Sequence, residues 1–189
     1  MAEYTQSLFP ALQAMALVAP SLYTGLTFTY SHVVIPPMTS YAPPKLLAKQ
    51  WLQAYQFAPA FVAPLILLST SSNALLSYLT DEVQSHSSAL YATAAALTAS
   101  IIPYTALYME PGINGAGKWK AQELLRGEFE LQGAGQGTDK DTARVSWKSW
   151  AETVDMKTIA EVWARTNAWR YVITGAATLI SATATISMA

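Results

Sequence analysis

The chain has 189 residues, of which 52% are hydrophobic and only 12% are charged, about half the charge of an ordinary soluble domain. Of its 23 Asp, Glu, Lys and Arg residues, 18 lie between Glu110 and Arg170, which leaves four stretches of about 20 residues or more without charge. This distribution excludes a soluble globule, a nucleic-acid binder and a disordered tail, and it predicts a small polytopic membrane protein.

Four apolar spans are predicted in chain order, at about residues 11–35, 57–79, 89–109 and 168–187. Pro36–Pro37 is expected to end the first span, because proline removes a helix donor. Lys45–Gln56 is amphipathic and is expected to lie at the interface before the second span. Pro111–Gly112 is expected to end the third span.

The charged segment at residues 110–167 is predicted to be an amphipathic loop between the third and fourth helices. Lys118–Gln132 has helical spacing of its apolar residues, and Gly133–Arg144 is expected to be flexible. Trp147–Arg170 is predicted to be one continuous helix that leads into the fourth span. The predicted fold class is therefore an all-α membrane protein, a single four-helix transmembrane domain over residues 1–189.

The basic residues predict how the chain lies in the membrane. All eleven fall in the first loop, at residues 36–56, or in the long loop at residues 110–167 and its flank. Since Lys and Arg collect on the cytoplasmic side, both loops are expected to be cytoplasmic and both termini lumenal or exterior.

Antiparallel threading of these spans predicts a cluster of polar and aromatic groups near the cytoplasmic end of the bundle. Its members come from all four helices: His32, Tyr55, Tyr108, Glu110, Asn114, Trp163, Asn167 and Arg170. Ionisable groups at membrane depth are costly, which makes them functional candidates. A purely structural alternative remains for each, because Glu110 could pair with Arg170 or a loop lysine, and Trp163 could anchor the helix at the interface.

Several kinds of site are disfavoured by the residue inventory. The chain has no cysteine, which excludes disulfides, thiolate metal sites and iron–sulfur clusters. Its other histidine, His86, is predicted on the opposite side of the membrane from His32, so a shared haem or a 2-His-1-carboxylate triad is not expected. No metal site is predicted, and an enzyme of this composition would depend on its side chains and on the reactivity of its substrate.

Four segments resemble the fungal anthrone oxygenase family of small integral membrane proteins: GLTFTYSHVVIPP, YMEPGIN, KWKAQELL and VWARTNAWR. The resemblance implies conversion of an anthrone to an anthraquinone in aromatic polyketide biosynthesis. It also implies molecular oxygen as co-substrate without a cofactor, and a location in the endoplasmic reticulum or another endomembrane. The expected partners are the lipid bilayer and a lipophilic aromatic small molecule, with no nucleic acid.

That reaction requires a base, donors for a developing oxyanion and an apolar pocket. His32 is expected to be the base and Glu110 to orient it, with Glu110 itself as the alternative base. Oxyanion donors are expected from Asn114, Asn167 and Arg170. The predicted substrate-binding residues are Tyr55, Tyr108, Asn114 and Trp163.

Two other classes of function remain open at this point. One is a membrane cyclase or isomerase that uses Glu110 as an acid. The other is a non-catalytic tetraspan that scaffolds pathway enzymes or carries lipophilic intermediates. The small-residue runs YATAAALTAS and TGAATLISATATIS also permit close helix contacts, which would allow a homo-oligomer.

Overall fold

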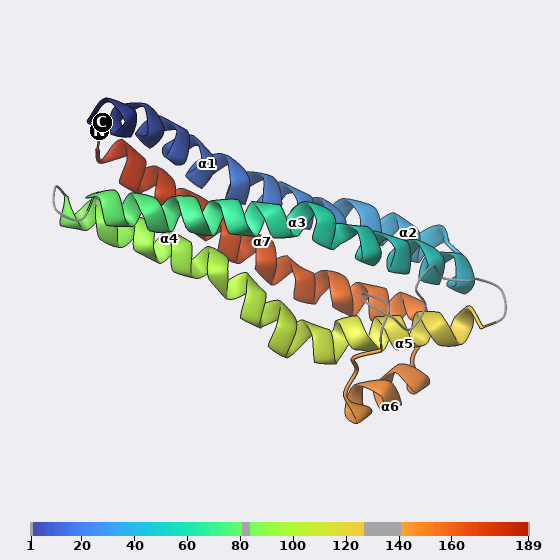
Figure 1. Cartoon of the computed structure of the whole chain (residues 1–189). Helices are drawn as coiled ribbons and strands as arrows, with labels where there is room; N and C mark the ends of the chain where they lie inside the picture. The colour runs from blue at the N-terminus through green and yellow to red at the C-terminus, as the bar shows by residue number, and fades with distance from the viewer. Residues whose placement is uncertain (1, 81–83, 127–140, 189) are drawn as a thin grey trace. The chain divides into compact units, whose positions relative to one another are not determined.

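The computed structural model describes residues 2–80, 84–126 and 141–188, with side chains from Leu8 onward. Every regular element in these ranges is helical, which confirms the predicted all-α class (Figure 1). The elements are α1 (Ala2–Thr29), η1 (Tyr30–Val34), α2 (Ile35–Tyr41), α3 (Pro44–Thr80), α4 (Ser85–Pro103), η2 (Tyr104–Asn114), α5 (Gly115–Leu124), α6 (Val145–Thr153) and α7 (Met156–Ile186), where η1 and η2 are π-helical.

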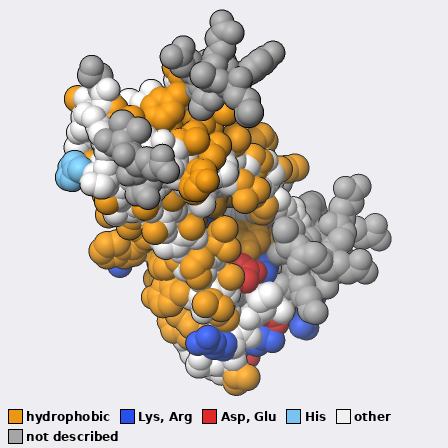
Figure 2. Space-filling model, turned by 60° about the vertical axis from the view of Figure 1, so that its left-hand side comes forward, with side chains coloured by type: hydrophobic (Ala, Val, Ile, Leu, Met, Phe, Trp, Pro, Cys, Tyr) orange, Lys and Arg blue, Asp and Glu red, His pale blue; other side chains and the backbone are white. Residues whose placement is uncertain are grey.

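The described residues include three helical segments that are long and apolar enough to cross a membrane: Leu8–Tyr41, Pro44–Thr80 and Ser85–Leu124. Hydrophobic side chains also cover much of the surface in Figure 2. These features support an integral membrane protein. The predicted fourth span lies within α7, whose first half carries Lys157, Glu161 and Arg165, and it stays a prediction.

Pro36 and Pro37 do not end the first helix, contrary to the prediction. Helical structure runs from α1 through η1 and continues as α2 to Tyr41. Both prolines lie in the first turn of α2, where the missing N–H groups would have few helical partners anyway. The preceding π-helical turn has a wider hydrogen bond, in which the Ile35 N–H donates to the Tyr30 carbonyl.

Lys45–Gln56 forms the first part of the continuous 37-residue helix α3, so no loop separates it from the predicted second span. Its position at the membrane interface stays a prediction. Pro44 begins this helix, at a position where proline is well tolerated. The predicted loop at residues 36–56 is therefore helical except around Ala42 and Pro43.

Helical structure does not end at Pro111–Gly112 either. The π-helical segment η2 passes through Pro111, and only Gly112 leaves helical geometry, with φ −104° and ψ −117°. Helical structure then resumes as α5, whose Gly115 N–H donates to the carbonyls of Glu110 and Gly112. The kink thus bends the helix where the sequence pattern suggested a loop.

The segment from Trp147 to Arg170 is two helices, and the prediction of one continuous helix was wrong. α6 ends before Val154, whose backbone is extended, and α7 begins at Met156. Asp155 starts the new helix, because its Oδ1 accepts a hydrogen bond of 2.8 Å from the Thr158 N–H. The stretch at residues 127–140, which includes most of the predicted flexible segment, lies outside the described residues.

The chain forms two compact units, and each is built from stretches of several helices. Unit 1 comprises Met1–Thr27, Phe61–Ile101 and Trp169–Ala189, and unit 2 comprises Phe28–Ala60 and Ile102–Ala168. Small and aromatic residues such as Ala16, Tyr23 and Tyr91 form the cores of unit 1. Unit 2 has a larger core around Trp51, Met109, Ile113, Ile159 and Trp163. The single four-helix domain over residues 1–189 stays a prediction.

Candidate functional site

The carboxylate of Glu110, on η2 in unit 2, accepts hydrogen bonds from four side chains. Tyr55 donates its hydroxyl to Oε2 at 2.5 Å, and the Asn114 amide donates to the same oxygen at 3.0 Å. Lys118 donates to Oε1, and the Thr142 hydroxyl lies 3.1 Å from that oxygen. Both carboxylate oxygens therefore have fixed donors, drawn from α3, η2, α5 and the segment before α6.

The ion pair between Glu110 and Lys118 is largely removed from solvent. The Lys118 side chain is 1% exposed and that of Glu110 is 25% exposed. Charges at such depth require close pairing and further hydrogen bonds to offset the loss of hydration. The Lys118 ammonium has a second favourable contact, since it lies 5.4 Å from the centre of the Tyr55 ring.

Three aromatic side chains are connected to this pair. Trp51 stacks on Tyr55 with ring centres 5.5 Å apart. It also makes an edge-to-face contact with Trp163, with ring centres 6.0 Å apart. The Trp163 indole N–H donates to Asn114 Oδ1 at 2.9 Å. Asn114 therefore links Trp163 to the Glu110 carboxylate, and Tyr55 links Trp51 to it.

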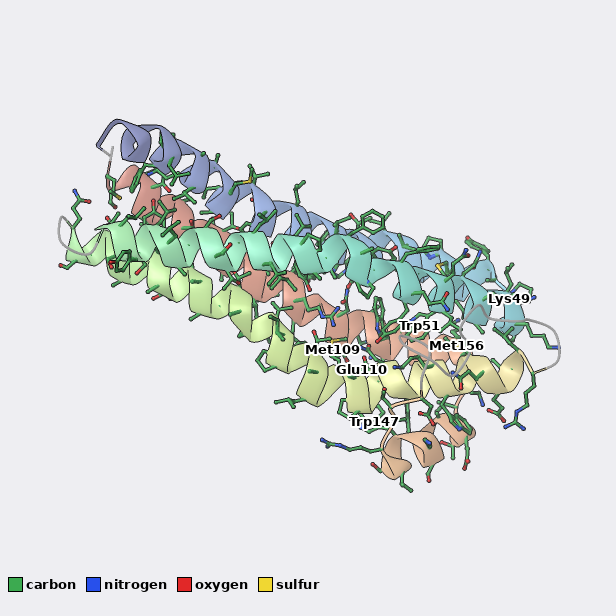
Figure 3. All side chains as sticks on the ribbon, viewed as in Figure 1. Lys49, Trp51, Met109, Glu110, Trp147 and Met156 are labelled. Carbon is green, nitrogen blue, oxygen red and sulfur yellow. The ribbon has the colours of Figure 1, made fainter. Side chains whose placement is uncertain are left out.

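Helical spacing and two glycines place these groups. Glu110, Asn114 and Lys118 follow one another at intervals of four residues along η2 and α5, and the Asn114 and Lys118 side chains both reach the Glu110 carboxylate across the bend at Gly112. A Cβ at Gly117 would lie 2.4 Å from Cη2 of Trp51, so only glycine allows α5 to approach that indole so closely. Figure 3 shows Trp51 on α3 and Glu110 on η2 within this part of the molecule.

A second glycine allows the segment before α6 to reach Glu110. A Cβ at Gly115 would lie 2.4 Å from the backbone nitrogen of Ala143. Next to this contact, the Arg144 N–H donates to the Pro111 carbonyl at 3.0 Å, and the Thr142 hydroxyl lies 2.9 Å from the Glu110 carbonyl oxygen. The kink in η2 and the described part of the long loop are thus connected at the carboxylate.

Four of the predicted site residues meet in this cluster: Tyr55, Glu110, Asn114 and Trp163. The suggested pairing of Glu110 with a lysine is found, with Lys118 as the partner. The chemical roles assigned to these residues stay predictions.

The other four predicted residues differ in exposure and in contacts. His32 is exposed, and its ring centre is 4.8 Å from that of Phe28. Tyr108 is 60% exposed and stacks on Tyr104. Asn167 is buried and donates to the Ser31 hydroxyl at 3.0 Å. Arg170 is half-buried and belongs to unit 1.

Three residues of the cluster were missed by the sequence analysis: Trp51, Lys118 and Thr142. Two had a usable signal, because Trp51 precedes Tyr55 by four residues and Lys118 follows Asn114 by four. Lys118 was expected in a helical part of the charged loop, and no single loop lysine was selected as the partner of Glu110. Thr142 had no signal, since it lies in a small polar stretch with no periodicity.

Comparison with known proteins assigns the chain to a family. A family model described as anthrone oxygenase matches residues 51–180, a range that includes Tyr55, Glu110, Asn114 and Lys118. Neither the curated proteins nor the solved structures gave a match. The matched range covers more than half of the chain and agrees with the resemblance found in its short motifs. This protein therefore belongs to the anthrone oxygenase family.

Proposed function

We propose that this protein is a membrane-embedded oxygenase that converts an anthrone to an anthraquinone with molecular oxygen in aromatic polyketide biosynthesis. The observation that carries the proposal is the buried Glu110–Lys118 pair against the rings of Tyr55, Trp51 and Trp163, in a member of the anthrone oxygenase family. A planar, apolar ketone that is about to become an anion would find both an aromatic surface and a cation there. The proposed location is an endomembrane.

The first step of the proposed reaction is proton transfer from the anthrone methylene to the Glu110 carboxylate. Loss of this proton gives an anion that is delocalised onto the ketone oxygen, and the Lys118 ammonium then stabilises that oxygen in place of the carboxylate. The site contains one negative and one positive charge before and after the transfer. No additional charge has to be desolvated, which lowers the barrier to forming the anion in an apolar environment.

The second step uses the electron-rich anion itself. It gives one electron to oxygen, and the resulting substrate radical and superoxide combine at the former methylene carbon to form a peroxide. Protonation of the peroxide and loss of water leave the new carbonyl of the quinone. One anthrone and one oxygen molecule thus give one anthraquinone and one water, so the proposed reaction needs no resident cofactor.

Glu110 is the proposed base in preference to His32, because Glu110 lies beside a buried cation and aromatic rings whereas His32 is exposed against Phe28. Tyr55 and Asn114 fix the carboxylate and are proposed to position it. Tyr108, on the exposed side of its helix, is proposed to contact substrate that enters from the bilayer.

The test is oxygen uptake by purified protein with an anthrone, under air and under nitrogen, corrected for spontaneous oxidation. Glu110→Gln should lower turnover by about 10²–10⁴-fold, the usual contribution of a general base, while His32→Ala should retain most of it. The opposite result would assign the base to His32.

The same assay decides between the classes of function. Wild-type protein that does not accelerate oxygen uptake would reject the oxygenase proposal. Conversion of substrate without oxygen uptake would indicate a cyclase or isomerase, and binding without conversion would indicate a carrier.

A further inference from the structure

The indole N–H of Trp51 is a buried donor without an acceptor in the described part of the chain. Trp51 is 2% exposed, and its Nε1 has no hydrogen-bond partner among the described residues. The neighbouring Trp163 differs, because its Nε1 donates to Asn114. Buried polar groups in folded proteins are nearly always paired, so an unpaired donor in the core of unit 2 needs an explanation.

The surroundings of Trp51 fix its orientation. One face of the indole stacks on Tyr55, whose hydroxyl donates to Glu110, and the ring makes an edge contact with Trp163. The far end of its six-membered ring lies against Gly117 of α5, so closely that a Cβ on this glycine would be 2.4 Å from Cη2 of the ring. Rotation of the indole is blocked on these sides. Its N–H, on the five-membered ring, is therefore fixed in direction and belongs to the same cluster as the charged pair.

We propose that the Trp51 N–H binds an oxygen of the substrate, the ketone oxygen of a planar aromatic ring system. This inference rests on the proposed function and assigns Trp51 as a further substrate-binding residue of that site. An indole N–H donates and never accepts, so its partner must carry an acceptor. The hydrogen bond strengthens as negative charge develops on the ketone oxygen, which makes the donor useful in the anion-forming step.

The unpaired N–H also has a consequence for specificity. A site with a buried donor discriminates against ligands that lack the matching acceptor, because such ligands leave the donor unpaired and desolvated. Anthraquinone and anthracene are a suitable pair of probes, since they share a planar tricyclic shape and only anthraquinone carries oxygen. Wild-type protein should bind anthraquinone more tightly than anthracene.

The decisive variant replaces Trp51 with β-(3-benzothienyl)alanine, which keeps the size of the ring and exchanges the N–H for sulfur. Affinity for anthraquinone, measured by titration in detergent, should fall by about tenfold, the factor for a hydrogen bond of typical net strength. Affinity for anthracene should not change. With an anthrone, kcat/KM should fall by a similar factor.

Two control replacements separate binding from folding. The same analogue at Trp163 removes the bond to Asn114 and should lower the Tm, whereas at Trp51 it should leave the Tm unchanged or raise it. Trp169→Phe alters a 60%-exposed indole and should change neither affinity.

Equal affinities of anthraquinone and anthracene for the wild type would overturn the proposal. So would a Trp51 analogue variant whose affinity for anthraquinone is unchanged, or whose affinities for both ligands fall by the same factor. Failure of the oxygenase proposal gives a different result. Discrimination between the ligands that depends on the Trp51 N–H, in a protein that consumes no oxygen, would support this donor and reject the oxygenase.

Discussion

Lys118 illustrates how a single residue determines whether a carboxylate can remain ionised inside the protein. Its side chain is 1% exposed and its ammonium pairs with Glu110, while Tyr55, Asn114 and Thr142 complete the donors. Removal of one partner from a buried pair is far more costly than removal of both, because the remaining charge is desolvated without compensation.

We therefore expect Lys118→Met to lower the free energy of unfolding by about 3 kcal/mol. The double variant Glu110→Gln with Lys118→Met should recover most of that loss, since neither charge remains. The free energy of unfolding of both variants is measured on purified protein in detergent, with tryptophan fluorescence as the signal. Equal instability of the single and double variants would show that the charge on Glu110 is not the cause.

Asp155 is a residue whose effect depends on pH. The pKa of its carboxyl lies below the ordinary value of 3.8, because the Thr158 backbone N–H and then the Thr158 side chain donate to the carboxylate. A depressed pKa in the folded state means that the carboxylate stabilises the protein above the unfolded pKa. This stabilisation is lost as the pH falls through the folded pKa.

Asp155→Ala should consequently destabilise the start of α7 by about 1 kcal/mol at neutral pH. The difference from the wild type should shrink as the pH falls below 3.8, when the cap of the wild type becomes protonated. Asp155→Asn retains an accepting oxygen and should show a smaller loss at neutral pH. The measurement is Tm against pH, and a difference that is constant with pH would contradict the capping role.

At the scale of elements, the contact between α3 and α5 depends on the absence of a side chain. Gly117→Ala should destabilise the protein by about 1–3 kcal/mol, because its Cβ would overlap the ring of buried Trp51. Gly25→Ala, on α1, is the matched control. Nothing lies within 4 Å of its added Cβ, and alanine favours the helix by about 0.5–1 kcal/mol.

The measurement is the Tm of both variants together with oxygen uptake. Gly117→Ala should lose both stability and turnover, and Gly25→Ala should gain stability without loss of turnover. Equal behaviour of the two glycines would show that the close approach to Trp51 is unimportant.

The proline-containing elements show why the ends of helices were predicted poorly. Pro36–Pro37 and Pro111 were expected to end helices, yet a π-helical segment precedes or contains each of them and the helix continues. Proline marks where regular α-helical hydrogen bonding must fail. It does not specify whether the helix ends there or continues with a π-helical turn that is one residue wider. That outcome depends on what packs against the next turn.

At the scale of the whole molecule, the open question is whether α7 crosses the membrane. The chain has no cysteine, so single-cysteine variants give an unambiguous labelling pattern. With four spans, cysteines at Ser40 and Ser149 should react with an impermeant maleimide from the cytoplasmic side. Cysteines at Gln84 and Ser187 should react only from the other side.

Labelling of Ser187→Cys from the cytoplasmic side would reduce the count to three spans. Each variant must retain oxygen uptake before its label is interpreted. Labelling of Ser40 and Ser149 on opposite sides would contradict the orientation predicted from the basic residues.

The sequence by itself determined the class of the protein. Low charge and long apolar stretches predict membrane helices because burial in hydrocarbon depends on composition. Short motifs around Glu110 and Trp163 were sufficient to indicate the family, and helical spacing with antiparallel threading brought Tyr55, Asn114 and Trp163 into the expected cluster.

Only the tertiary structure decided what the cluster is. It selected Lys118 as the lysine that pairs with Glu110 and placed His32 on an exposed face. It also left the Trp51 N–H without a hydrogen-bond partner among the residues that the structure describes. These outcomes depend on the kink at Gly112 and on close approaches at Gly115 and Gly117. Periodicity fixes which residues share a helix face, whereas the partner of each face is determined by packing between segments distant in the chain.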